Sequence, residues 1–579
     1  MKKETKNMRF AGQGAEVLKL NAWRRATRAA GLTLCLGGAV MLAACNSGSS
    51  GDDATEPAPT PEQPVSGVYD KDLAFDASNY TKLTVSVDGE AVPVRWYKEV
   101  CYVAKPTTIK ERVAGGPPVN IENPECGFQS MNVFVPESVA EKQDNAIYFA
   151  VSNSGWFSSY VGASIKEGDE FDSATSNVGA ALKAGYVFIN VGSRSRGLIA
   201  TDDTYPGKAP AVVVDAKAAI RYLRLNDDAM PGSAERIVIN GTSGGGAMVS
   251  IVGASGNSAD YLPYLDAAGA AGISENGEST LRDDVLAVVS YCPITDLGNA
   301  DLSYEWLYTK LDTRALAGQD PNPQGSAELT AKFKSYQQGL GLKNADGQPL
   351  TEANMLATIR QEVARSAEVF MSNGGVIPAF GDTWSDDNSI NDWIHVDAQT
   401  GKVSDIDMER YLLYVVNKRA LKTAPAFDQK GLTVTKAEGE SNLFGTPEQL
   451  YSNFTEYAWD NNDVPGDGIG LDDTGLSWRQ HIAREPGNVL VEQLKLVNPM
   501  EYIGTDADTS PYWYVRHGTL DRDTSFVISL NLSRALQADA KVRDVDYRLA
   551  WHTGHAGNYD VPEAMGWVAE KLKQADAAR

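Results

Sequence analysis

The stretch Ile237–Val252, IVINGTSGGGAMVSIV, decides the fold. An apolar run, Ile237–Asn240, leads into a Gly-x-Ser-x-Gly pattern at Gly241–Gly245, and helix-forming residues follow. A chain that turns sharply from a strand into a helix crowds its own backbone, so glycines are needed on both sides of the central residue. The strained turn pushes the serine side chain outward and places it beside the first amides of the helix. The pattern therefore predicts that Ser243 is a nucleophile.

Buried strands and helices alternate on both sides of this turn. Apolar runs predict strands at Ala146–Val151, Tyr186–Val191, Val285–Tyr291, Tyr512–Val515 and Asp546–Trp551, and helical patterns occupy Val178–Lys183, Val213–Leu223, Ser525–Ala538 and the segment from Val561. Runs of β-branched residues without alternation, separated by helices, are typical of a parallel sheet covered on both faces. The strand, turn and helix around Ser243 then indicate an α/β-hydrolase fold with a mostly parallel central sheet.

One long segment interrupts this pattern. Residues 295–499 are polar, helical in composition and rich in Asn, Asp and Gly loops, and the strand pattern resumes only near Tyr512. We therefore expect a large inserted lid domain at 295–499. The two parts of the α/β-hydrolase core lie on either side of it, at 67–294 and 500–579.

The N-terminus has the features of an export signal. Residues 1–44 combine a basic region with the apolar run Ala29–Ala44, which is shorter than the roughly 20 residues that a membrane span needs. The run ends in Leu-Ala-Ala-Cys45, which resembles the lipobox of bacterial lipoproteins, so we expect Cys45 to be lipidated. An ordinary signal peptide cut elsewhere is the alternative. Asn46 after the cysteine favours the outer membrane, and residues 45–66 form a flexible Ser, Pro and Gly-rich tether.

Charge and cysteine usage limit the partners. The formal net charge is −24, and removal of residues 1–44, which carry six excess positive charges, leaves −30. Such a surface repels phosphate backbones, so no nucleic-acid partner is expected. In an oxidising compartment Cys101 and Cys126 are spaced to form a disulfide, and Cys292 remains as a buried thiol. No CxxC or HExxH pattern occurs, so we expect neither a metal site nor a cofactor.

A serine nucleophile needs a base, and the base needs an orienting carboxylate. The chain holds five histidines, namely His395, His481, His517, His552 and His555. In this fold the order along the chain is Ser, acid, His. That order disfavours His517, which precedes the acid loop, and leaves His555 as the favoured base with His552 as the alternative. Asp521 is the favoured acid, with Asp523 as its competitor.

The oxyanion of an acyl-transfer intermediate needs two amide donors. One is expected from Gly244, the residue after the nucleophile. The second should come from the loop after the first strand, where Gly155 and Trp156 are the candidates. A packing role is the alternative for the Trp156 side chain.

Several segments, taken together, resemble one family. They are Gly241–Gly245, the YCPITDL stretch at Tyr291–Leu297, the stretch Tyr512–Thr524 with its RHGTLDRDT sequence, and Gly554–Asp560. These are similar to bacterial tannases, the subtype B tannase-like α/β-hydrolases, over roughly residues 145–567. The resemblance implies galloyl ester hydrolysis, a lid inserted in the core, and a triad of Ser243, Asp521 and His555.

The resemblance also implies substrate-binding residues. The second Asp of the DRD sequence, Asp523, would bind a galloyl hydroxyl, and the lid would supply a Lys and a Glu. Lys422 and Glu440 lie in the segments that look equivalent, and Glu448 competes with Glu440. A buried carboxylate discriminates against rings that lack hydroxyl donors, which gives this assignment a physical reason.

The predicted partner is thus a small phenolic ester, cleaved through an acyl-enzyme. Three alternatives remain open at this point: a feruloyl or general carboxylesterase on the same scaffold, a non-catalytic surface binding protein, and a serine peptidase. The sequence indicates neither an oligomeric state nor the natural ester.

Overall fold

The computed structural model describes residues 66–113, 121, 123, 125–161, 165–429, 439–462, 474–484 and 489–578. These residues all fall within one unit, 64–579. The predicted signal segment 1–44, its lipidation site Cys45 and nearly all of the tether lie outside the described residues. No helix in the described ranges is long and apolar enough to cross a membrane.

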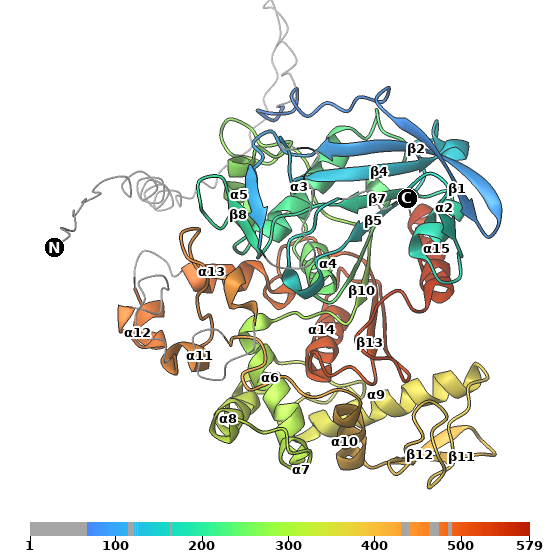
Figure 1. Ribbon diagram of the computed structural model, residues 1–579, viewed down its shortest axis with the longest axis vertical. Helices are drawn as coiled ribbons and strands as arrows, with labels where there is room; N and C mark the ends of the chain where they lie inside the picture. Colours follow the sequence, from blue (N-terminus) through green and yellow to red (C-terminus); the bar gives the residue numbers. More distant parts are fainter. Residues whose placement is uncertain are drawn as a thin grey trace, which may run out of the picture. The chain divides into compact units, whose positions relative to one another are not determined.

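A central ten-stranded sheet carries the fold (Figure 1). In spatial order its strands are β14 (Asp544–Ala550), β13 (Tyr512–Gly518), β10 (Ala287–Tyr291), β9 (Ile237–Thr242), β5 (Ile147–Val151), β7 (Val187–Val191), β4 (Ser130–Pro136), β2 (Glu90–Cys101), β1 (Thr81–Val87) and β6 (Glu170–Phe171). The pairs from β14 to β7 all run parallel, and β7, β4, β2 and β1 pair antiparallel. The prediction of a mostly parallel sheet in an α/β-hydrolase fold is confirmed.

Two separate apolar cores lie on the two faces of this sheet. The helices of the larger core are α3 (Ala211–Leu225), α4 (Gly244–Ala254) and α14 (Phe526–Ala538), and those of the smaller core are α2 (Asn177–Lys183) and α15 (Val561–Ala577). Strand β10 illustrates how the sheet separates the two cores: Val288 packs into the larger core, while Ala287 and Val289 pack into the smaller one. Alternate residues of a strand face opposite sides, so a strand buried on both sides is apolar throughout.

The antiparallel end of the sheet was not predicted. Strand β1, TKLTVSV, alternates exposed and buried residues, with Leu83, Val85 and Val87 on the buried side. That alternation is the usual signal of a strand with one face in water. Strand β4 is buried along its whole length, so its apolar run MNVFV was a second missed signal.

The described part of the inserted segment, residues 295–499, has helices as its main regular elements. Its elements are α6 (Leu297–Thr309), α7 (Thr313–Leu316), α8 (Pro323–Gly339), α9 (Glu352–Ser372), β11 (Ile394–Asp397), β12 (Lys402–Ile406), α10 (Met408–Lys418), α11 (Glu456–Asp460), α12 (Trp478–Ile482) and α13 (Val489–Leu496). In Figure 1, α6 to α10 lie together beyond α14 and β13. Polar contacts join them to the core, since Gln337 and Asn531 exchange two side-chain hydrogen bonds and Tyr411 donates to the Thr519 carbonyl at 2.5 Å.

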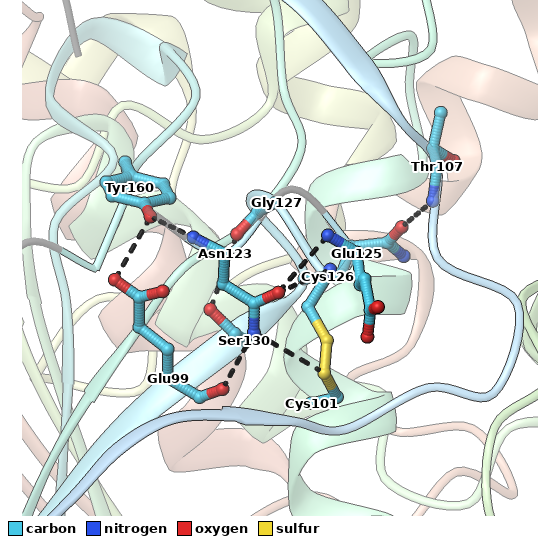
Figure 2. The surroundings of a disulfide bond; sticks show 10 residues. Glu99, Cys101, Thr107, Asn123, Glu125, Cys126, Gly127, Ser130 and Tyr160 are labelled. Carbon is cyan, nitrogen blue, oxygen red and sulfur yellow. Dashed lines mark hydrogen bonds between the residues drawn. A yellow bond between two sulfur atoms is a disulfide. The ribbon is translucent and has the colours of Figure 1, made fainter. Parts of the chain in front are cut away.

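A disulfide joins Cys101, the last residue of β2, to Cys126, with their Cα atoms 5.6 Å apart (Figure 2). Next to the disulfide, the side-chain oxygen of Asn123 accepts from the amides of Glu125 and Cys126. Near the same disulfide, Tyr160 donates at 3.0 Å to the carboxylate of Glu99, a residue of β2. The cross-link thus holds the antiparallel end of the sheet to the connection that leads into β4.

Candidate active site

Ser243 lies at the turn between β9 and α4, at the carboxyl end of a central parallel strand. Its backbone has φ 78° and ψ −115°, a region that side-chain-bearing residues rarely adopt. The neighbouring backbone leaves no room for side chains: a Cβ on Gly241 would collide with the Gly245 carbonyl, and one on Gly244 would collide with the Trp156 amide. These contacts explain the glycines of the pattern and hold Ser243 in its strained conformation.

Three side chains form a hydrogen-bonded chain at this point. The Ser243 Oγ and His555 Nε2 atoms are 2.7 Å apart, and His555 Nδ1 lies 2.7 Å from Asp521 Oδ2. His555 follows β14 and Asp521 follows β13, so all three groups come from the carboxyl ends of sheet strands. Ser243 is 6% exposed and Asp521 is fully buried, while the His555 side chain is 16% exposed. The imidazole thus connects a buried carboxylate to a nearly buried hydroxyl.

The Asp521 carboxylate has more partners than the predicted triad. His517 Nε2 lies 3.3 Å from Asp521 Oδ2, and the Asp523 amide donates to Asp521 Oδ1 at 2.7 Å. Burial by itself would raise the pKa of Asp521, but His517 and His555 outweigh that effect, and its pKa falls well below the ordinary value. The sequence excluded His517 as the base from chain order, and gave no sign that it faces the same carboxylate.

His552, the alternative base, lies elsewhere. Its Nε2 is 2.7 Å from the Tyr414 hydroxyl of α10, and its ring stacks on Trp384 at 4.8 Å between centroids. Burial lowers the pKa of His552, which favours the neutral ring in this aromatic contact. His552 therefore connects the core to the inserted segment, and His555 alone of the two contacts Ser243.

The candidate oxyanion donors lie in adjoining backbone segments. Gly244 is the first residue of α4, so its amide is among those that a helix start leaves without an intrahelical partner. The loop with Gly155 and Trp156 packs directly on it. The Trp156 amide donates to the Asn153 carbonyl at 3.0 Å, and the Trp156 ring is buried and donates to the Ile294 carbonyl. The Trp156 ring therefore has a packing role, and this holds whether the Gly155 or the Trp156 amide is the second oxyanion donor.

The three predicted substrate-binding residues share one charged environment. Burial lowers the pKa of Lys422, and the carboxylates of Glu440 and Asp523 partly offset that effect. The Lys422 ammonium lies 4.1 Å from the centre of the Phe427 ring. Glu440 is 6% exposed, whereas its competitor Glu448 is exposed to solvent. Burial beside Lys422 therefore distinguishes Glu440 from Glu448.

Two arginines that the sequence did not single out hold Asp523. Arg419, just after α10, donates to Asp523 Oδ2 at 2.7 Å, and Arg522 donates to Asp523 Oδ1 at 2.7 Å. Tyr304 of α6 connects the same groups, because its hydroxyl donates to the Arg522 carbonyl and accepts from the Lys422 amide. Arg522 belongs to the DRD sequence, but no local motif marks Arg419 or Tyr304, because the contacts join α6, the end of α10 and the loop after β13.

The thiol of Cys292 also borders the triad. Its Sγ lies 3.9 Å from His555 Nε2 and donates to the Ala556 carbonyl at 3.3 Å. Burial raises the pKa of Cys292, and the charges of Asp521 and Asp523 add to the effect. A protonated, buried thiol is a poor nucleophile, so Cys292 does not replace Ser243 as the candidate nucleophile.

The chain is similar to known hydrolases in sequence and in fold. A family model described as BD-FAE matches residues 131–330. The native structure of a tannin acyl hydrolase from Lactobacillus plantarum is 27% identical, with a TM-score of 0.67, and the match covers 86% of this chain and 99% of that chain. A tannin acyl hydrolase in complex with ethyl gallate is 28% identical, with a TM-score of 0.66 and the same coverage. A tannase from Fusobacterium nucleatum is 28% identical, with a TM-score of 0.65, again over 86% of this chain and 99% of that chain.

A search of curated protein sequences found no match. The fold and the structural similarities together support a carboxylic ester hydrolase function, and the chain is tannase-like in its architecture.

Proposed function

We propose that the protein hydrolyses galloyl esters with Ser243 as its nucleophile. One observation carries the proposal: a continuous Ser243–His555–Asp521 hydrogen-bonded chain borders a cluster of Lys422, Glu440 and Asp523. The first group supplies acyl-transfer chemistry, and the second matches a ring that carries several hydroxyl groups. The similar structure that contains ethyl gallate supports the same substrate class.

The first half of the reaction forms an acyl-enzyme. The Ser243 oxygen attacks the ester carbonyl while His555 Nε2 takes the hydroxyl proton, and the carbonyl π electrons move onto oxygen. Asp521 accepts from His555 Nδ1, which holds the ring in the required tautomer and stabilises the imidazolium. The Gly244 amide, with a donor from the Asn153–Trp156 loop, stabilises the oxyanion. Collapse expels the alcohol, which takes its proton from His555.

The second half regenerates the serine. Water attacks the acyl carbonyl and His555 again takes a proton, so a second tetrahedral intermediate forms. Its collapse breaks the bond to Ser243, which recovers its proton from His555, and gallate leaves. Each step uses side chains of this chain alone, so the mechanism requires no cofactor.

Recognition of the acyl ring follows from donor and acceptor balance. Neighbouring phenolic hydroxyls are donors, and the carboxylates of Asp523 and Glu440 are acceptors. A ring without hydroxyls would leave these desolvated carboxylates and Lys422 without substrate partners, which weakens its binding. A ferulate ring, which carries one free hydroxyl, would satisfy the cluster only in part.

Hydrolysis of three esters tests the proposal. The mature protein and a Ser243→Ala variant are incubated with methyl gallate, methyl ferulate and p-nitrophenyl acetate. We expect Ser243-dependent turnover with the highest kcat/KM for methyl gallate. Turnover of the other two esters without methyl gallate would retain the mechanism and replace the substrate by that of a feruloyl or general carboxylesterase. No turnover, together with no labelling of Ser243 by a fluorophosphonate, would favour a non-catalytic binding protein.

We also propose that the enzyme is exported and anchored through a lipid on Cys45, with the outer membrane as its location. The lipobox-like Leu-Ala-Ala-Cys45 and the apolar run before it support this. A bacterial cell fed with radiolabelled palmitate should label the wild-type chain and not a Cys45→Ser variant. Equal labelling of both chains, or none of either, would contradict the anchor.

A further inference from the structure

The contacts of one buried arginine join the loop beside the nucleophile to the inserted segment. Arg196 lies between β7 and β8 (Leu198–Ala200) and is 5% exposed. Its Nε donates to the Gly155 carbonyl at 2.8 Å, and its Nη1 donates to the Gly439 carbonyl at 2.5 Å. Its Nη2 lies 3.6 Å from Glu440 Oε1. One guanidinium therefore contacts both the candidate oxyanion loop and a candidate substrate-binding residue.

The contact with Gly155 bears on the candidate oxyanion loop, in which the Trp156 N–H already donates to the Asn153 carbonyl at 3.0 Å. The Gly155 carbonyl and the Trp156 amide belong to the same planar peptide unit, so fixing the direction of the carbonyl also fixes the direction of the N–H. A cation on the carbonyl also polarises the amide and makes it a stronger donor. Arg196 thus strengthens the turn that the Trp156 N–H closes onto Asn153. This turn holds the other candidate donor, the Gly155 amide, in the loop that packs against Gly244.

The rest of the Arg196 segment holds the same loop. The Arg196 carbonyl accepts from the Ser158 amide at 3.1 Å, and the guanidinium packs over the Phe157 ring at 4.0 Å. The neighbouring Ser195 hydroxyl donates to the Trp156 carbonyl at 2.5 Å. The loop therefore takes its conformation from this segment as well as from its own sequence.

The contact with Glu440 has a second effect. The guanidinium beside the Glu440 carboxylate, together with its bond to the Gly439 carbonyl, fixes the place where the inserted segment presents this acceptor. Guanidinium is suited to this task because its planar fork makes several directed hydrogen bonds at once, which a lysine ammonium on a flexible stem does not reproduce.

The geometry points to Arg196 as a positioning residue that couples substrate recognition at Glu440 to the conformation of the candidate oxyanion loop at Asn153–Trp156. The recognition half of this inference rests on the proposed galloyl substrate. The oxyanion half holds for any ester that Ser243 attacks. A substrate that strengthens the contact at Glu440 orders the same guanidinium that orients the oxyanion loop.

An Arg196→Lys variant tests the inference, with Arg221→Lys as a matched control. Arg221 is also buried and donates to the backbone carbonyls of Ala271, Gly272 and Leu281. These carbonyls lie outside the elements that carry the triad. Active sites are counted with a fluorophosphonate and folding is measured by thermal melting, so that kcat refers to folded enzyme only. Methyl gallate and p-nitrophenyl acetate are the two substrates.

We expect Arg196→Lys to lower kcat about 10- to 100-fold for both esters, since the oxyanion loop serves both. KM should rise about 10-fold for methyl gallate only, because acetate has no ring to contact Glu440. Arg221→Lys should lower the melting temperature and leave both kinetic constants within twofold. An unchanged kcat for p-nitrophenyl acetate in Arg196→Lys, or equal kinetic losses in the two variants, would overturn the inference.

A double-mutant cycle with Glu440→Gln tests the coupling itself. If Arg196 acts on galloyl binding through Glu440, the KM effects of the two substitutions on methyl gallate are less than additive. Additive effects would overturn the recognition half. If the wild-type enzyme cleaves only p-nitrophenyl acetate, the galloyl substrate fails, while the kcat comparison on that ester still decides the oxyanion half.

Discussion

The sheet core and the inserted segment contribute to the site in different ways. The core supplies Ser243, Asp521 and His555 from the ends of β9, β13 and β14, which hydrogen bonding holds in register with their neighbours. The inserted segment supplies Lys422 and Glu440 from stretches outside its long helices, held by buried ion pairs and side-chain contacts. One such pair is Arg314 and Glu305, 2.5 Å apart, and Arg314 also donates to the Lys422 carbonyl at 2.9 Å.

This difference between the core and the inserted segment indicates which part of the molecule determines catalysis and which determines substrate specificity. The proposed catalytic side chains lie at the ends of strands, where a shift of the strand by one residue would change which side chain reaches the site. On the proposed function, specificity lies in the inserted segment, whose geometry depends on charged groups packed against one another, and at Asp523, a core residue that Arg419 of that segment contacts. Substitutions of the triad should therefore affect every ester, and substitutions at Asp523 or in the inserted segment should affect galloyl esters selectively.

The largest effect is expected for the nucleophile. Ser243→Ala should lower kcat/KM for every ester by a factor of about 10⁴ or more, because no other group takes its place. Ser250→Ala is a matched control, since Ser250 is a buried serine of the same helix whose hydroxyl donates to the Gly246 carbonyl. Initial rates on p-nitrophenyl acetate measure both variants. Comparable losses in the two would mean that the loss comes from helix α4 and not from the nucleophile.

The orienting carboxylate should come next. Asp521→Asn keeps the shape but can no longer fix the His555 tautomer, and kcat should fall by about 10³ to 10⁴ for all esters. Asp560→Asn provides the comparison, because this carboxylate accepts from Tyr291 and Tyr514 and has no bond to His555. Its kcat per active site should remain within about fivefold of wild type. A loss confined to methyl gallate in Asp521→Asn would contradict its place in the triad.

Specificity should respond to Asp523. Asp523→Asn keeps the volume and removes the charge, so methyl gallate should lose about 10- to 100-fold in kcat/KM while p-nitrophenyl acetate changes less than threefold. Arg419→Ala removes one partner of this carboxylate, a side chain that is 61% exposed. Its effect should have the same selectivity and be smaller, since exposed ion pairs contribute little. Equal losses on both esters would remove the distinction between the two regions.

The smallest effect concerns a bond between the two regions. The buried Lys208 ammonium donates to the carbonyls of Asn442, Phe444 and Leu450 at 2.8–3.0 Å, and burial lowers the pKa of Lys208 to about 7. The unfolded chain, with the ordinary pKa near 10.5, then binds more protons than the folded chain between these values. Stability should therefore rise as pH increases from 7 toward 10, a contribution that Lys208→Met lacks.

Thermal melting from pH 7 to 9.5 measures this contribution as the difference between wild type and Lys208→Met. That difference should grow by several degrees in favour of wild type as pH rises. The exposed residue Lys142 gives a control, and Lys142→Met should follow wild type across the range. A difference that stays constant with pH would show that Lys208 is fully charged in the folded protein.

The sequence predicted the part of the molecule that local rules determine. The parallel strands, the turn at Ser243, the order of the triad and the boundaries of the helices around it all follow from patterns within one or two elements. Strand β1 was not predicted because its exposed and buried residues alternate and form no continuous apolar run. Strand β4 does contain such a run, MNVFV, so its absence from the prediction has no comparable reason in the pattern. Arg196 and Arg419 were not predicted because their partners lie in distant parts of the chain, and a charged residue looks the same in sequence whether it is buried or solvated. His517 lies only four residues before Asp521, but the sequence does not show that its ring faces that carboxylate.

Strands β10 and β13 lie side by side, yet residues 292–511 separate them along the chain. Lengthening such a connection costs little, because the entropy of closing a loop grows only with the logarithm of its length, about 0.6 kcal/mol for each doubling. Two strands that pair in register therefore tolerate a long inserted segment between them. For protein engineering this makes the connection a natural crossover point for recombination. An exchanged insert would change the substrate specificity while the sheet and its strand-end residues stayed the same, provided that the insert carried its own partner for Arg196.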